Sequence, residues 1–141
     1  MSRSGYSDGI EYWALIRWRG AVASAIRGKR GQAFLREMRD ALDAMPEKVL
    51  IANDLVDVEG SHCALGVVGA ARGVDLSSID VGDYEQVASA FGIAQALAQE
   101  IEYENDECIS EWGAYRPNNM TEGERRWIYM RRWVENHLAK T

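Results

Sequence analysis

The sequence predicts a mainly α-helical protein that folds as a single compact domain of about five helices. Three observations support this prediction: apolar residues recur at helical spacing along most of the chain, glycines and capping residues separate these runs, and the 141 residues include only 2 prolines. A chain of this length, with 47% hydrophobic residues, can bury a core of its own. We therefore expect one domain over residues 1–141, with a flexible start at residues 1–6.

The first two helices are predicted over residues 8–27 and 32–45. Ser7 is the expected N-cap of the first helix, in which apolar side chains recur every three or four positions. Gly28 is expected to end this helix and to open a Gly-Lys-Arg-Gly turn, and Pro46 stops the second helix. Two helices joined by a short turn form a helical hairpin.

Between residues 47 and 65 the pattern favours a small β-hairpin, at about residues 49–63. Residues 49–51 and 56–58 are short runs rich in Val and Ile around Glu-Gly-Ser, as is typical of two strands and a turn. A short helix for the first run stays an alternative, because runs of this length do not distinguish the two structures.

The next helix is predicted from Ala64 to a cap at Gly73, and its small residues indicate close packing against a neighbour. Two further helical runs cover residues 84–91 and 93–103. Gly92 should interrupt or bend the chain between them.

A polar loop over residues 105–121 is expected before the last helix. Thr121 and Glu124 have the spacing of a capping box, which fixes the start of that helix. The side chains expected to face the core are Trp127, Met130 and Trp133.

Charge is distributed unevenly along the chain. The net charge is −6, yet residues 1–39 contain eight Lys or Arg and three Asp or Glu, so this part carries about +5 and the remainder about −11. The simpler interpretation is that the basic start pairs with the acidic remainder or is solvated. Contact with nucleic acid is the alternative.

No set of side chains provides a nucleophile, a base and an orienting residue, so we expect no catalytic residue, no cofactor and no metal. Cys63 lies at the start of a helix and is the strongest nucleophile candidate, but a buried thiol is the simpler interpretation. A zinc site is disfavoured because His62, Cys63, Cys108 and His137 lack the usual ligand spacing. The two cysteines are expected to be reduced.

The helix before the polar loop ends in acidic residues, which oppose the helix dipole. They are Glu100, Glu102, Glu104, Asp106 and Glu107. We expect them to be solvated or to pair with Arg125, Arg126, Arg131 and Arg132. Asn105 and Asp106 are interpreted as residues that end the helix and fix a loop, not as ligands.

Aromatic and basic residues indicate where a partner could bind, because interfaces favour Trp, Tyr and Arg. The candidate interaction surface consists of Trp18, Arg19, Lys29, Arg30, Trp112 and Tyr115. The alternative of nucleic-acid binding uses the basic residues of the first two helices, namely Arg17, Arg19, Arg27, Lys29, Arg30 and Arg36.

Four stretches carry a resemblance to a known family: WALIRWRGAVASAIRGKRGQAFLREM at 13–38, CALG at 63–66, FGIAQALAQEI at 91–101 and YENDE at 103–107. Together they resemble a family of small uncharacterised proteins encoded by tailed phages and prophages. The resemblance implies a phage accessory protein that binds a host or phage protein and could inhibit a bacterial defence or host process. It implies no site residues.

The start of the chain lacks the apolar core of a signal peptide, and no segment approaches the ~20 apolar residues that span a bilayer. We therefore expect a protein of the host bacterial cytoplasm that does not contact membranes and that could form a homodimer. A small enzyme or ligand binder built around Cys63 with Asn105 and Asp106 stays an alternative function.

Overall fold

The computed structural model describes residues 3–5, 11–108 and 119–140. Within these ranges the chain forms six α-helices and one short 3₁₀ helix, η1, so the mainly α-helical prediction is confirmed. The helices are α1 (Tyr12–Arg27), α2 (Lys29–Ala44), α3 (Ala64–Arg72), η1 (Leu76–Ser78), α4 (Tyr84–Phe91), α5 (Gln95–Asp106) and α6 (Glu122–His137).

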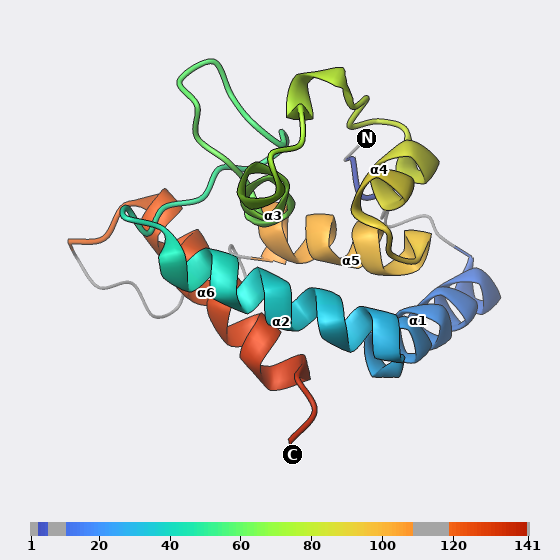
Figure 1. The fold of residues 1–141 in the computed structure, drawn as a ribbon. Helices are drawn as coiled ribbons and strands as arrows, with labels where there is room; N and C mark the ends of the chain where they lie inside the picture. Colours follow the sequence, from blue (N-terminus) through green and yellow to red (C-terminus); the bar gives the residue numbers. More distant parts are fainter. Residues whose placement is uncertain (1–2, 6–10, 109–118, 141) are drawn as a thin grey trace.

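Helix α5 lies at the centre of the fold (Figure 1), where it contacts α1, α3, α4 and α6. Helix α2 packs against α1, α3 and α6 on one side of the molecule. The side chains with almost no exposed surface come from these helices and include Leu35, Met38, Leu42, Leu65, Val68, Leu97, Ile101, Met130 and Val134. The hydrophobic core therefore lies where α2, α3, α5 and α6 meet.

The junction between α1 and α2 is tighter than the sequence predicts. Gly28 alone separates the helices, with an extended backbone (φ −65°, ψ 157°), and α2 begins at the next residue. A Cβ atom on Gly31 would lie 1.9 Å from the carbonyl oxygen of Ala25, so glycine permits this close approach. The amide of Gln32 then donates to the carbonyls of Ile26 and His137, which connects α1 and α2 to the end of α6. The predicted four-residue turn is replaced because three of its residues, Lys29, Arg30 and Gly31, belong to α2.

Segment 49–63 contains no strand, and the predicted hairpin is reduced to one antiparallel bridge between Val56 and His62. The Asp57 carboxylate accepts the backbone N–H groups of residues 59 and 61 and so fixes the turn. The backbone N–H groups of Leu50 and Ile51 donate to the carbonyls of residues 123 and 62. Residues 49–51 are thus held by α6 and a loop and do not pair with a second strand.

The glycine caps are found where the sequence predicts them. Gly73 ends α3 and Gly92 ends α4, both with the left-handed backbone (φ 75° and 68°) that glycine adopts readily. The capping box of Thr121 and Glu124 at the start of α6 is also confirmed. Helix α5, however, continues to Asp106, beyond the predicted end at residue 103.

Candidate functional site

An N-terminal arm, residues 3–5, lies against the last turns of α5. Arg3 donates from Nε and Nη2 to the two carboxylate oxygens of Asp106, at 2.6 and 2.8 Å. Ser4 donates to Glu107 at 2.7 Å, and its carbonyl accepts from Gln99 at 3.1 Å. Both Arg3 and Ser4 are buried, although the sequence places them in a flexible start.

Asn105 connects α5 to three other segments. Its side-chain oxygen accepts the backbone N–H of Ala64 at the start of α3, and its amide donates to the carbonyl of Ile51 at 2.9 Å and to Asp106. Its own carbonyl accepts from the buried Arg126 of α6 at 2.7 Å. Asn105 therefore fixes a loop, as the sequence predicts, although it lies inside the helix and does not end it.

Glu102 is buried next to this network without a hydrogen bond on either carboxylate oxygen. Burial raises its pKa to about 7, because the nearby Arg3 guanidinium, 3.4 Å away, only partly offsets desolvation and Asp106 adds a second negative charge. Arg3 Nη1 is also buried without a partner. The arm and α5 thus enclose an incompletely satisfied cluster of one cation and two carboxylates.

Cys63 and His137, which the sequence singles out as candidate reactive residues, each make a local contact at a helix end. Cys63 is only 1% exposed, and its Sγ accepts the N–H of Gly66 as the cap of α3, which agrees with a buried thiol. His137 contacts the carbonyl of Trp133 through Nδ1 at 2.7 Å. Among the residues that the structure describes, no group of three or more His, Cys, Asp and Glu is placed to hold a metal ion.

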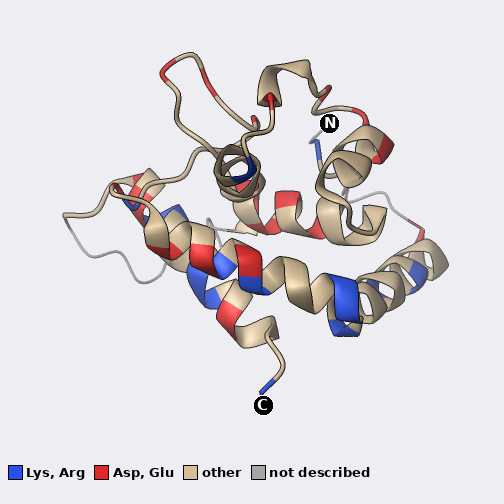
Figure 2. Cartoon of the chain, viewed as in Figure 1, with Lys and Arg blue, Asp and Glu red and all other residues tan. Residues whose placement is uncertain are grey.

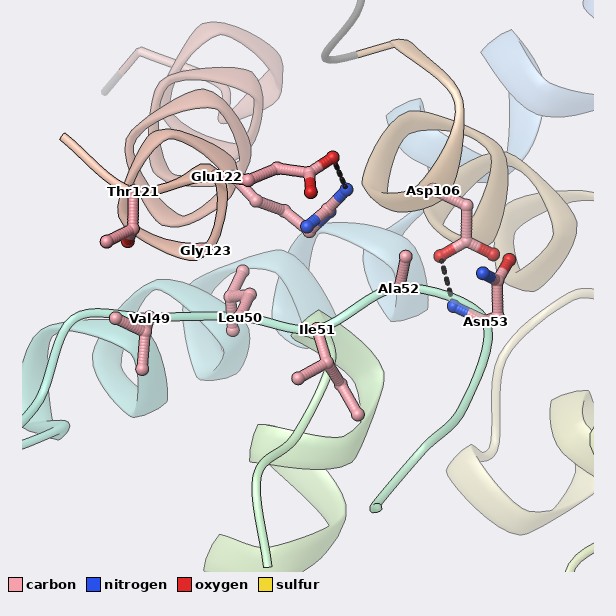
Figure 3. Close-up of a pocket in the computed structure, with 10 residues that line it drawn as sticks. Val49, Leu50, Ile51, Ala52, Asn53, Asp106, Thr121, Glu122 and Gly123 are labelled. Atoms are coloured by element: carbon pink, nitrogen blue, oxygen red, sulfur yellow. Dashed lines mark hydrogen bonds and ion pairs between the residues drawn. The ribbon is translucent and has the colours of Figure 1, made fainter. Parts of the chain in front are cut away.

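A pocket of about 540 Å³ opens beside the cluster, between segment 49–53 and the start of α6 (Figure 3). Asp106 reaches into it from α5 and accepts the backbone N–H of Asn53 at 3.1 Å. Glu122 accepts from Arg126 at 3.3 Å on the opposite wall. Asp106 and Arg126 thus line the pocket while they hold segment 49–53 and the end of α5 in place.

Among the residues that the structure describes, two strongly exposed aromatic side chains, Tyr12 and Trp13, lie on the first turn of α1. We define the α1 face as Tyr12, Trp13, Ile16 and Arg17. Tyr12 and Trp13 are 67% and 62% exposed, their ring centroids are 5.6 Å apart, and Ile16 is 43% exposed. Arg17 lies one helical turn beyond Trp13 and is also exposed. These side chains form a continuous apolar and cationic surface.

The exposure of this face could not be predicted from the sequence, because Tyr12 and Ile16 share helical spacing with the residues of the buried stripe. In the structure α1 buries only Val22 and Ile26, near its other end. The available signal was the crowding of large apolar residues at 12–18, which is more than a single stripe can cover.

The interaction residues predicted from the sequence are placed differently from one another. Trp18 is half-buried and packs against the core, and Arg19 donates to Glu100 at 2.7 Å while its side chain stays 48% exposed. Lys29 and Arg30 are exposed at the start of α2. Trp112 and Tyr115 lie outside the described residues.

The predicted pairing of the acidic end of α5 needs correction. Glu100 pairs with Arg19, and Glu102 and Asp106 pair with Arg3, so the cations come from the start of the chain. The expected partners on α6 bind elsewhere in two cases: Arg131 pairs with Asp43, at 2.7 Å, and Arg126 with Glu122. The interpretation that the basic start pairs with the acidic remainder is therefore confirmed for Arg3 and Arg19.

Comparisons of the chain with protein-family models, with curated proteins and with solved structures give no match. In the described part of the chain, none of the helices has both the length and the apolar character needed to cross a bilayer.

Proposed function

We propose that this protein acts without catalysis, by binding another protein through the α1 face. The observation that carries the proposal is the exposure of Tyr12, Trp13 and Ile16 together on one end of a helix. Large exposed apolar side chains that lie next to each other mark interaction sites more often than isolated ones do. Trp, Tyr and Arg are also the residues that contribute most to binding energy at interfaces.

The charges around the α1 face favour an acidic partner. Helices α1 and α2 expose five cations that form no ion pair with any residue the structure describes: Arg17, Arg27, Lys29, Arg30 and Arg36. Unpaired cations beside an apolar face speed association with an acidic surface and exclude basic ones. Lys29 and Arg30, predicted from the sequence as interaction residues, belong to this set.

The same cations favour nucleic-acid binding as the second candidate. Phosphate groups would be bound by the α1–α2 junction, where Arg27, Lys29 and Arg30 follow one another. The exposed aromatic side chains of the α1 face lie about four turns from Arg27, at the other end of the same helix. A protein partner uses these side chains more fully than a duplex backbone does. We therefore prefer the protein partner.

The resemblance to phage and prophage proteins extends the proposal. We propose a phage accessory protein that acts in the cytoplasm of the host cell on a host or phage protein, and that inhibits a bacterial defence or host process. The enzymatic alternative is less well supported, because Cys63 caps α3 and Asn105 and Asp106 hold loops.

Affinity purification from host lysate tests the α1 face. We expect the tagged protein to recover a stoichiometric partner, and Trp13→Ala to weaken its binding by about 2 kcal/mol, or roughly 30-fold, as for an interface anchor. The matched control is Asn136→Ala, which changes an exposed residue of α6 and should leave recovery unchanged. Isothermal titration with the purified partner measures the difference.

Nuclease treatment of the lysate separates the two candidates. A partner that survives nuclease and is lost with Trp13→Ala supports the proposal. Equal recovery by Trp13→Ala and the original protein would exclude the α1 face as the binding site, and partners that disappear only after nuclease treatment would favour nucleic acid.

A further inference from the structure

A second surface has the opposite charge and a matching apolar character. It is a groove of about 720 Å³ between residues 54–58 and residues 76–81. Its apolar lining consists of Leu55, Val56, Val58, Leu76, Ile79 and Val81. Leu55 and Leu76 are buried, and Val56, Ile79 and Val81 are partly buried against the core, whereas the Val58 side chain is fully exposed. Val58 is therefore the apolar side chain of this surface that the fold leaves uncovered.

Carboxylates surround this groove. Asp54, Asp57 and Asp80 line it, and Glu59, Asp75, Asp83 and Glu85 stand in or beside the same loops. None of the seven forms an ion pair with a residue that the structure describes. Several are held in place by backbone contacts: Asp57 accepts from residues 59 and 61, and Asp80 accepts from Gly82 at 2.9 Å. Asp57 and Asp80 are therefore fixed in position, and the seven carboxylates have no counter-ion among the described residues.

The α1 face complements the groove in both properties. It presents Trp13, Ile16 and Tyr12 as apolar side chains and Arg17 as an unpaired cation, with the further cations of α1 and α2 behind them. In Figure 1, α1 and the loop of residues 54–60 lie at opposite ends of the molecule, and Figure 2 shows acidic residues along that loop and basic residues on α1 and the start of α2. One molecule cannot join its own two surfaces.

We infer that the α1 face of one molecule docks in the acidic groove of a second copy, so that the protein self-associates head to tail. This inference rests on the proposed function, because it names a second copy as a partner of the α1 face. The two surfaces differ, so the contact is heterologous and repeats from copy to copy unless a ring closes. Occupation of the α1 face by a second copy would also compete with a foreign partner.

The expected strength of this contact is low. Three exposed apolar side chains on α1 and one central valine in the groove form a small interface, of the size found in transient complexes. Opposite charges raise the association rate at low salt and are screened within about 10 Å at ~0.1 M salt. We expect self-association with a dissociation constant of roughly 10–100 μM at low salt, and weaker association as salt increases.

Complementary variants test the head-to-tail arrangement. Val58→Lys places a cation in the groove, and Arg17→Glu places an anion on the α1 face; neither residue has a contact that the fold depends on. Sedimentation velocity of the full chain over increasing concentration, at ~0.02 M and ~0.3 M salt, measures the mass of the species formed. Val58→Thr and Arg17→Lys are the matched controls, since they keep shape and charge.

The original protein should show a concentration-dependent increase in mass at low salt, and each variant alone should be monomeric. An equimolar mixture of Val58→Lys and Arg17→Glu should form a one-to-one dimer that does not grow, because only the intact α1 face of the first and the intact groove of the second remain. A monomeric original protein, or association that persists in either variant, would overturn the inference. The lysate experiment with Trp13→Ala is independent: an original protein that stays monomeric but still recovers a partner that Trp13→Ala loses would reject this inference alone and leave the proposed function in place.

Discussion

Gly66 determines how closely α3 approaches the chain before it. A Cβ atom at this position would lie 1.9 Å from the carbonyl oxygen of Leu55 and 3.2 Å from the side chain of His62. Because a backbone carbonyl cannot rotate away as a flexible side chain can, Gly66→Ala forces α3 and residue 55 apart. We expect this substitution to lower the free energy of unfolding by about 2–4 kcal/mol.

The matched control is Gly20→Ala in α1, where a Cβ atom meets nothing within 4 Å. Alanine is the better helix former, so this variant should gain about 0.5–1 kcal/mol. Urea unfolding followed by circular dichroism measures both variants. Similar changes in the two would show that helix propensity, and not the contact with Leu55, decides the effect at residue 66.

Individual residues could be predicted where their role is local. Gly73, Gly92 and the pair of Thr121 and Glu124 act within one turn of a helix end, and their sequence patterns identify them. Glu100 and Glu102 could not be predicted as buried, because their partners, Arg19 and Arg3, are about 80 and 100 positions away in the sequence. From the sequence alone a carboxylate is expected at the surface, because the distant cation that pairs with it in the fold is not known.

Helix α5 organises the packing of its neighbours through Asn105. Replacement by Ala removes the acceptor of the Ala64 N–H and the donor to the Ile51 carbonyl, and leaves both backbone groups without these partners. An unsatisfied buried group costs about 1–3 kcal/mol, so Asn105→Ala should lower the free energy of unfolding by roughly 2–4 kcal/mol.

Hydrogen exchange locates this effect. Protection should fall at the start of α3 and in segment 49–53, while α2 keeps its protection. Asn136→Ala on the exposed side of α6 is the control and should change stability by less than about 0.5 kcal/mol. Unchanged exchange at Ala64 in Asn105→Ala would contradict the role that we assign to this side chain.

Whole elements could be predicted more reliably than their contacts. The helical runs follow from periodicity and caps, although the sequence predicts about five helices, because it leaves open whether Gly92 bends or interrupts one run, and the described residues form six. The extension of α5 to Asp106 could not be predicted, because Asn and Asp usually compete with helical hydrogen bonds. In α5 the side chains of Asn105 and Asp106 bind other segments, so they do not compete with the backbone hydrogen bonds of the helix. Their partners are Ala64, Ile51, Arg3 and Asn53. The exposed α1 face could not be predicted for a similar reason: helical spacing shows which residues share a side of a helix, but not which side is covered.

The molecule as a whole combines buried and surface ion pairs with two regions of exposed charge that form no ion pair within the described residues. Arg3 and Arg19, at the start of the chain, offset the buried carboxylates of α5. The remaining cations of α1 and α2 and the carboxylates around the groove stay exposed at opposite ends. The net charge of −6 therefore says little about partners, because each end presents a field of one sign.

The internal cluster makes the stability of the whole fold depend on pH. Arg3 forms its paired hydrogen bonds with Asp106, which leaves Glu102 buried with little compensation and raises its pKa to about 7 from an ordinary value of 4.5. The folded state thus holds the Glu102 proton more tightly than the unfolded state. Its contribution to stability is complete below pH 4.5 and is lost as the pH rises through 7.

Glu102→Gln keeps the shape of the side chain and removes this titration. Between pH 4.5 and pH values above 7, we expect the free energy of unfolding of the original protein to fall by on the order of 3 kcal/mol relative to that of Glu102→Gln. The reason is that the pKa of Glu102 is about 7 in the folded state and 4.5 in the unfolded state. Urea unfolding of both proteins at a series of pH values measures this difference, and contributions of the other carboxylates cancel in the comparison. Parallel curves for the two proteins would mean that Arg3 keeps Glu102 ionised at neutral pH. The cluster would then act as an ordinary buried ion pair, and removal of Arg3 would destabilise the fold at neutral pH more than at acidic pH.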